Sequence, residues 1–423
     1  MTGRLDHIRE LGADAILLTP INRAPSYHRY DTTDFRALDP LLGTWDDLAE
    51  LVRQAHARGL RLVFDVALNH VSRDHPWFRA AAAGGAGARE RQYFRFLEDG
   101  KYLCWWGYGH MPELQLDHPD LLDELFLGED SVLAFWLGKG FDGVRLDCAN
   151  DLTFPLCRRI SEAVKARFPD AAVLGEICNY SAPWLDALDG TQSYFFTASL
   201  KALWQKSISH GQFQRNMQMA YGGGAYRQFQ MLSSHDIPRA RTEFATDPAF
   251  LRAARRLQFT LPGIPMVYYG EEFGLEGAKD PDNRATVPWE TWPARRLEPD
   301  ARELQELIRL RQASPELRAG RWEPVFTDGV ADLVAFFRVL PEDPQRFTLV
   351  AWNDASQARP VTLTVPWGWL FSEVELREVF TGRTCQVGAG LITLPLEPRE
   401  CSVWQINPGN KGSYSFFKSW HLP

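Results

Sequence analysis

The chain alternates short apolar runs with longer amphipathic stretches over its first 320 residues. The short runs have the length and composition of buried strands, and the longer stretches repeat their apolar residues with the period of a helix. We expect strands at 13–19, 61–66, 143–146, 171–174, 192–196, 228–232 and 265–268, and helices at 5–11, 45–58, 121–139, 155–168, 197–210, 248–261 and 301–313. This repeated order predicts an α/β fold with a parallel sheet, closed into a (β/α)8 TIM barrel.

Two segments depart from the alternation. Residues 70–118 form an excursion of about 50 residues, rich in Gly, Trp and Tyr, which is long for a βα loop and predicts a functional domain B over the barrel mouth. From about residue 321 the chain turns to short strands separated by turns, at 333–339, 348–352, 361–365, 374–379, 391–394 and 401–406. We therefore expect a catalytic barrel over 1–320, a C-terminal antiparallel β-sandwich domain over 321–408, and a tail over 409–423.

The beginning of the barrel is unusual. A strand is expected before the helix at 5–11, yet the sequence opens almost on that helix, so seven barrel strands are counted and the first strand is missing. Three explanations stay open. The barrel is open, another segment such as the aromatic tail at 413–420 fills the gap, or the sequence starts part-way into the protein.

Three carboxylates follow three of the apolar runs, namely Asp147, Glu176 and Asp236. Arg145 lies two residues before Asp147, and because strand side chains alternate with period two, both point to the same face. A permanent cation beside Asp147 favours its ionised form, as a carboxylate nucleophile requires. Since the carboxyl ends of parallel strands meet at one edge, the three acids indicate one catalytic mouth.

The amino-acid composition indicates which classes of molecule the protein can bind. Of 423 residues, 45% are hydrophobic and 24% are charged, which is typical of a globular protein. The net charge of −8, without blocks of like charge, makes nucleic acid and anionic membranes poor partners and favours a neutral ligand. The 15 Trp residues suit stacking on sugars as well as core packing.

The N-terminal residues lack the apolar segment of a signal peptide, and no window of about 18 apolar residues exists to span a membrane, so we expect a cytoplasmic protein. The six cysteines are irregularly spaced and predict neither a zinc site nor a disulfide framework.

From about residue 4 to 408 the chain resembles the alpha-amylase family of glycoside hydrolases. The resemblance rests on six motifs in the family's order: Tyr30-Asp-Thr-Thr-Asp-Phe35, Asp65-Val-Ala-Leu-Asn-His70, Gly143-Val-Arg-Leu-Asp147, Gly175-Glu176, His235-Asp236 and Gly263-Ile-Pro-Met-Val-Tyr-Tyr-Gly-Glu-Glu272. Three further segments are similar to the neopullulanase, cyclomaltodextrinase and maltogenic amylase group: Met111-Pro-Glu-Leu114, Ala149-Asn150-Asp151 and Asp280-Pro-Asp282-Asn-Arg284. That group implies short or cyclic α-glucans as substrates.

The resemblance also implies roles for individual residues. Asp147 matches the nucleophile, Glu176 the acid and base, and Asp236 the third acid that binds sugar hydroxyls and favours the distorted ring. Retaining hydrolysis needs this division, with one carboxyl ionised and the other, here Glu176 in apolar surroundings, kept protonated. The other expected substrate-binding residues are Tyr30 as an aromatic platform, His70 and His235 as donors, Arg145, Asn150, and Trp106, Asp282 and Arg284 at outer sugars.

The chain departs from the related group in three places. Cys178-Asn179 stands after the acid where the group carries Trp-His, which puts acceptor binding in doubt. Asn69 matches a calcium position in many relatives, but the loop that often carries metal ligands is missing, so we expect no required cofactor and keep Asn69 as a candidate calcium ligand. The group's N-terminal β domain is missing too, so any oligomer must use another surface.

The leading hypothesis is a retaining hydrolase that cleaves α-1,4-glucosidic bonds of maltooligosaccharides or cyclodextrins. The first alternative is a transglycosylase with the same residues, in which a sugar hydroxyl replaces water. The second is a non-catalytic amylase-like binding protein, prompted by the missing strand. Taken singly, Asp147 with Arg145 also fits a buried structural ion pair, Glu176 a helix-capping partner, and His70 or His235 a core histidine.

Overall fold

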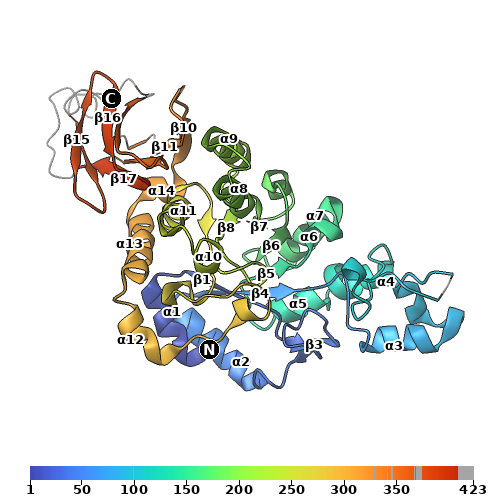
Figure 1. Ribbon diagram of the computed structural model, residues 1–423. Coiled ribbons are helices and arrows are strands. Elements are labelled where there is room, and N and C mark those ends of the chain that lie inside the picture. The colour runs from blue at the N-terminus through green and yellow to red at the C-terminus, as the bar shows by residue number, and fades with distance from the viewer. Residues whose placement is uncertain are drawn as a thin grey trace. The chain divides into compact units, whose positions relative to one another are not determined.

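The computed structural model describes residues 1–98, 100–327, 329–340, 342–343, 346–365, 367 and 374–407. The chain divides into two compact units, Met1–Gln192 and Ser193–Pro423, and each is described by itself (Figure 1). The tail expected over 409–423 lies outside the described residues. Among the helices that the structure describes, none is long and apolar enough to cross a membrane.

The first unit is built around parallel strands that follow one another in hydrogen-bonded order. The strand positions expected from the sequence are confirmed to within a few residues, and the stretch before the helix α1 is a short 3-10 turn. The strands are β1 (Ala15–Leu18), β4 (Arg61–Val66), β5 (Gly143–Leu146), β6 (Ala172–Ile177) and β7 (Gly190–Ser193), beside a small antiparallel pair, β2 (Asn22–Arg23) and β3 (Asp34–Leu38). Together with β8 and β9 of the second unit, the described residues contain seven parallel strands, the number expected from the sequence.

The helices of the first unit bury their apolar stripes against these strands. The helix α2 (Trp45–Ala57) begins at a capping box, in which Thr44 accepts from the Asp47 N–H and Asp47 accepts from the Thr44 N–H. Its buried residues lie at helical spacing, as the pattern predicted. The other helices are α1 (Leu5–Leu11), α3 (Pro76–Ala83), α4 (Pro119–Leu122), α5 (Val132–Leu137), α6 (Ala149–Leu152) and α7 (Phe154–Arg167).

The single helix expected over 121–139 is wrong. The structure contains α4, then one π turn over Asp123–Leu127, and then the separate helix α5. The break falls at Gly128, where an added Cβ would lie 2.6 Å from the Asp123 carbonyl oxygen, so only glycine fits. Ser131 then starts α5 by accepting from the Ala134 N–H.

The excursion at 70–118 contains α3, several 3-10 turns and isolated β-bridges rather than a sheet. Figure 1 draws α3 well away from β4 and β5. His75 caps α3, because its Nδ1 accepts from the Trp77 N–H at 3.2 Å. The segment is ordered by aromatic packing, with Phe78 in contact with the rings of Phe94 and Tyr102.

The second unit begins with helices around the short parallel strands β8 (Gln228–Gln230) and β9 (Ile264–Pro265). Two expectations need correction. The predicted strand at 192–196 ends at Ser193, and the helix α8 starts at Phe195; the helix α9 (His210–Tyr221) was not expected. Its signal was present, since Ser209 caps it and Phe213 and Met217 are buried at helical spacing. The helices are α8 (Phe195–Trp204), α9, α10 (Ala240–Glu243), α11 (Pro248–Thr260), α12 (Trp292–Arg295), α13 (Pro299–Ala313) and α14 (Pro315–Ala319).

The C-terminal β domain is antiparallel, as expected. All six expected strands are present, and two were missed. The strands are β10 (Arg321–Val325), β11 (Leu333–Val339), β12 (Phe347–Asn353), β13 (Arg359–Thr364), β14 (Glu375–Glu378), β15 (Thr384–Gly388), β16 (Leu391–Leu396) and β17 (Glu400–Ile406).

The central strands of this sheet are apolar on both faces. In β11, Val334 and Phe336 pack into a core shared with α9 and α11, whereas Leu333, Ala335 and Phe337 pack into the core of the β domain. Figure 1 draws β17 in red close to α11 and α14.

Candidate active site

A buried guanidinium holds together the carboxyl ends of three strands in the first unit. Arg145 on β5 contacts Asp147 at 2.6 Å and Glu176 of β6 at 3.0 Å, and its Nη1 donates to both oxygens of Asp65 on β4 at 2.8 and 3.0 Å. Its Nε donates to Gln192 at 3.1 Å. Two of the three expected acids therefore lie in one hydrogen-bonded cluster.

Asp65 was not assigned a role from the sequence. It lies in the second motif, at the end of β4, and the parallel register pairs Asp65 with Arg145 across β4 and β5. Tyr30 also joins the cluster, because its hydroxyl donates to Asp65 at 2.7 Å. The signal that could have identified Asp65 was an acidic residue at the end of a strand whose other residues are almost all apolar.

The cluster carries more negative than positive charge. Burial raises the pKa of Asp147 well above its ordinary value; Arg145 opposes this change, whereas Glu176 and Asp65 add to it. Burial also disfavours the Arg145 cation, but the three carboxylates together raise its pKa well above the ordinary value. Since one cation faces three carboxyls, the cluster retains a proton more readily than isolated carboxyls do.

Two expectations, one about Arg145 and one about Glu176, need correction. Arg145 was expected to pair with Asp147 alone, but it contacts Asp65, Asp147 and Glu176. Glu176 was expected in apolar surroundings, and it is buried, but Arg145 and a backbone N–H contact it. The strand β6 continues to Ile177 instead of ending at residue 174, so Glu176 lies within the strand rather than after it.

Cys148 connects the two catalytic candidates, and sequence reasoning missed it. Its backbone N–H donates to Oε2 of Glu176 at 3.0 Å, and its thiol donates to Oδ2 of Asp147 at 3.2 Å. The residue has a left-handed backbone, with φ 48° and ψ 44°. Such a conformation is unusual for a residue other than glycine and is often found at functional sites.

An aromatic layer stands beside His70. The His70 ring stacks on Trp105 at 5.3 Å, and Trp105 stacks on Tyr108 at 5.9 Å. Burial lowers the pKa of His70 to about 4, so the imidazole is neutral at neutral pH. Trp106 is 81% exposed and has a left-handed backbone with φ 48°, so its indole is held out towards solvent.

Asn69 does not form a closed oxygen-ligand site. Its Oδ1 lies 2.6 Å from Nδ1 of His70, and its Nδ2 contacts Asp151 at 3.5 Å. Among the described residues, one group of three acidic, His or Cys side chains has its ligand atoms close together, and that group is Asp147, Cys148 and Glu176. Calcium also binds amide and backbone oxygens, so Asn69 as a calcium ligand stays a prediction, and we derive no step through the ion.

The remaining expected residues of the second unit gather around the His235-Asp236 pair. Asp236 accepts from the Tyr194 hydroxyl at 3.0 Å and lies 3.0 Å from Nε2 of His235. Arg284 lies 3.8 Å from Asp236. Asp282, in contrast, is exposed in a short 3-10 turn.

Asn283 is a second residue that sequence reasoning missed. Its side chain is fully buried and donates to the carbonyls of His235 at 2.9 Å and Ile237 at 3.1 Å. It therefore orients the loop that carries Asp236. Asn150 likewise holds a loop in the first unit: its Oδ1 accepts from the Cys178 N–H, just after β6, at 2.9 Å.

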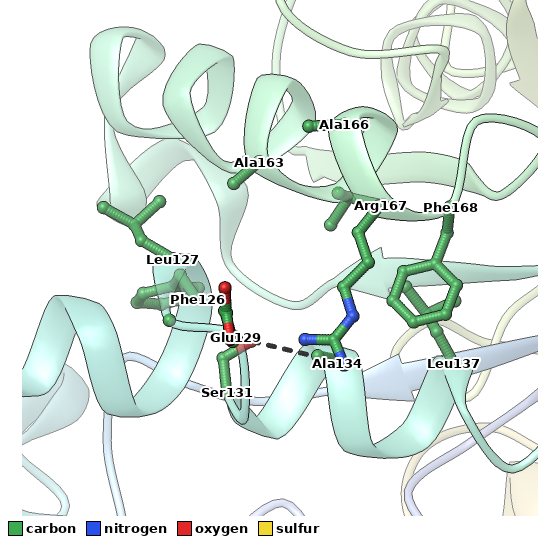
Figure 2. Close-up of a pocket in the computed structure, with 12 residues that line it drawn as sticks. Phe126, Leu127, Glu129, Ser131, Ala134, Leu137, Ala163, Ala166, Arg167 and Phe168 are labelled. Atoms are coloured by element: carbon green, nitrogen blue, oxygen red, sulfur yellow. Dashed lines mark hydrogen bonds between the residues drawn. The ribbon is translucent and has the colours of Figure 1, made fainter.

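A hollow of about 530 Å³ lies elsewhere in the first unit, among α5, α7 and the π turn. Figure 2 shows Arg167, Phe168 and Glu129 around it. It contains none of the residues singled out from the sequence, so it is separate from the candidate site. Its lining is Phe126, Leu127, Gly128, Glu129, Ser131, Ala134, Leu137, Ala163, Val164, Ala166, Arg167 and Phe168.

Comparison with known proteins adds to this geometry. A family model for the alpha amylase catalytic domain matches residues 1–107 and 97–359. Neopullulanase 2 of Thermoactinomyces vulgaris is 31% identical over 415 residues, which cover 93% of this chain and 68% of the relative. A cyclomaltodextrinase of a Bacillus species is 33% identical over 370 residues, 83% of this chain and 64% of the relative.

Among solved structures, a cyclomaltodextrinase matches with a TM-score of 0.83 and 28% identity, over 95% of this chain and 70% of that one. The expected fold class is thereby confirmed, namely a (β/α)8 barrel with a C-terminal antiparallel β domain. The chain spans roughly two thirds of the length of these relatives.

Proposed function

The chain belongs to the alpha-amylase family of glycosidases, and on that premise we propose that it is a retaining hydrolase of α-1,4-glucosidic bonds in maltooligosaccharides or cyclodextrins. The observation that carries the proposal is the spacing of Asp147 and Glu176. An oxygen of each carboxyl lies within 4.8 Å of the other. Retaining glycosidases hold their two carboxyls about 5 to 5.5 Å apart, whereas inverting enzymes leave about 6.5 to 9.5 Å for a water molecule.

The charge distribution supports a division of roles. Asp147 has the shorter contact with Arg145, at 2.6 Å, and Glu176 the longer one, at 3.0 Å. In the proposed mechanism Asp147 attacks the anomeric carbon as an ionised carboxylate, and Glu176 acts as the acid that gives its proton to the leaving oxygen. Glu176 then removes a proton from water, which attacks the anomeric carbon and releases Asp147.

Sugar binding is assigned from the motifs. We assign Asp236 the role of the third acid on the His235-Asp236 motif alone, with His235 and Arg284 as its partners in the second unit. Tyr30 serves as the platform, since the bond from its hydroxyl to Asp65 holds the ring in place. His70 is neutral and therefore suited to exchange hydrogen bonds with sugar hydroxyls.

The substrate class rests on the relatives' names and on exposed aromatic side chains. Neopullulanase and cyclomaltodextrinase are names of relatives, and we extend α-glucan substrates to this chain on that ground. Trp106 supports the extension, because an indole exposed at a strained backbone position suits stacking on a sugar face. Cys178-Asn179 keeps transglycosylation as the second candidate, since acceptor binding decides between water and a sugar hydroxyl.

The test is to incubate the purified 423-residue protein with maltotriose, γ-cyclodextrin and pullulan and to resolve the products over time. We expect glucose and maltose from the wild type and a loss of at least about 10⁴-fold in Asp147→Asn and Glu176→Gln. Asp170→Asn is the matched control, because it makes the same chemical change at an exposed position. Longer oligosaccharides at high maltotriose would favour the transglycosylase, and binding without turnover in a folded wild type would favour the binding protein.

A further inference from the structure

Cys148 makes contact with both catalytic carboxyls at once. Its backbone N–H bonds to Glu176 and its thiol to Asp147, at 3.0 and 3.2 Å. The left-handed backbone at φ 48° turns the residue back over the end of β5, which brings both donors to the site. The backbone contact would exist with any residue here, so the side chain is the distinctive part.

The two oxygens of Asp147 have different donors. Oδ1 is bound by the Arg145 guanidinium at 2.6 Å, which is a strong charge-assisted contact. Oδ2 is bound by the Cys148 sulfur. An ionised carboxylate can only accept, so the thiol must be the donor. Burial, with the nearby Asp147 and Glu176 charges, raises the pKa of Cys148, so the thiol keeps its proton at neutral pH.

We propose that Cys148 is a positioning residue of the reaction, whose S–H bond makes Oδ2 the attacking oxygen of Asp147 and stabilises that oxygen when it leaves. This inference rests on the proposed function. An S–H group is a weak donor, so Oδ2 is hindered less than Oδ1, which the guanidinium holds.

The thiol acts differently on the two steps. In the first step Oδ2 bonds to the anomeric carbon, the glycosidic bond breaks, and the Glu176 proton moves to the leaving oxygen. Negative charge leaves Oδ2, so the thiol bond weakens. In the second step water bonds to the anomeric carbon, its proton passes to Glu176, and the ester bond to Oδ2 breaks. Negative charge then returns to Oδ2, where the thiol stabilises it.

Removal of the thiol should therefore slow the second step specifically. We expect Cys148→Ala and Cys148→Val to lower kcat on an activated aryl α-maltoside about three- to tenfold, to lower KM in proportion, and to leave kcat/KM almost unchanged. The glycosyl-enzyme should accumulate, visible as added mass on the intact protein after rapid acid quenching. Cys148→Ser should restore the wild-type pattern because its hydroxyl also donates.

Cys385→Ala is the control, since this cysteine is half-buried like Cys148 but lies on β15 of the C-terminal β domain. The inference is overturned if Cys148→Ala and Cys148→Val accumulate no glycosyl-enzyme, if Cys148→Ser accumulates it as they do, or if kcat and kcat/KM fall together in the Ala and Val variants. Thermal unfolding of each variant separates loss of folding from loss of the second step. If the wild type turns over normally and only the variants disagree, the proposed function survives; no turnover by the wild type would overturn both.

Discussion

Two of the three arginines that are completely buried among the described residues, Arg145 and Arg338, are stabilised in opposite ways. Arg145 in the first unit faces three carboxyls and has a raised pKa. Arg338 on β11 in the second unit donates to the carbonyls of Thr260 and Gly320, at 2.9 and 3.0 Å. Burial lowers the pKa of Arg338 to about 9.

The contrast separates a structural site from a chemical one. Neutral carbonyls accept the hydrogen bonds of Arg338, and the nearby Glu316 charge only partly offsets its burial, so Arg338 ties the end of α11 and the start of β10 to the sheet. The Arg145 cluster has an excess of negative charge, which is costly to bury but allows a proton to move between carboxyls. Such an arrangement has no advantage for folding alone.

Replacement of Arg145 should produce the largest effect. Arg145→Met leaves three buried carboxyls without their cation, and they should take up protons, so Asp147 loses its charge at neutral pH. We expect activity on maltotriose to fall by about 10³-fold and stability to fall by about 3 to 5 kcal/mol. Product analysis and urea unfolding measure the two changes. Retention of most activity would contradict a role for this cation.

Replacement of Arg338 should affect stability without affecting chemistry. Arg338→Met removes the donors of two buried carbonyls but also removes a buried charge, so we expect a loss of about 2 kcal/mol. The kcat/KM of the folded variant should stay within about twofold of wild type. The measurement is urea unfolding beside an assay at 25 °C. A large fall in kcat/KM would remove the distinction between the two arginines.

Two histidines test the cost of burying a group that can become charged. Burial lowers the pKa of both His70 and His75 to about 4, whereas histidine in the unfolded chain has its ordinary pKa of 6.5. The unfolded state therefore binds more protons between these values, so stability should be lost as pH falls from about 6.5 to 4, by about 1 to 3 kcal/mol for the pair.

Urea unfolding at several pH values measures that slope. His75→Asn keeps a capping side chain for α3 and should reduce the slope by about half. An unchanged slope would show that carboxyls, not these histidines, govern acid unfolding.

The smallest expected effect is a gain in stability. Asp147→Asn removes one of three carboxyls that share a guanidinium, and we expect about 1 kcal/mol of added stability at neutral pH despite the loss of activity. Because the pKa of Asp147 is raised in the folded state, its destabilising effect grows as pH rises above the unfolded value. The gain should therefore vanish at about pH 2.5, well below the ordinary aspartate pKa of 3.8, where Asp147 is protonated in both states. Thermal unfolding at both pH values checks it.

The sequence alone was sufficient for the parts that local periodicity controls. The strands β4 and β5 and the helix α2 were located from apolar spacing, and the period of two placed Arg145 and Asp147 on one face. The ordered motifs then pointed to Asp147 and Glu176 before any geometry was known. The helix α9 was missed although its cap and spacing were visible, whereas the break at Gly128 depends on a close contact with the preceding turn.

Only the tertiary structure decided how the charges are shared. Asp65 lies 80 residues before Arg145 and Gln192 lies 47 residues after it, and the parallel register of the strands brings both to the same guanidinium. The double contact of Cys148 likewise depends on a left-handed backbone and on β6 lying beside β5. Periodicity decides which face of its own strand a side chain takes, but hydrogen bonds between side chains of different strands depend on which strands lie side by side, and that is decided by packing over the whole chain.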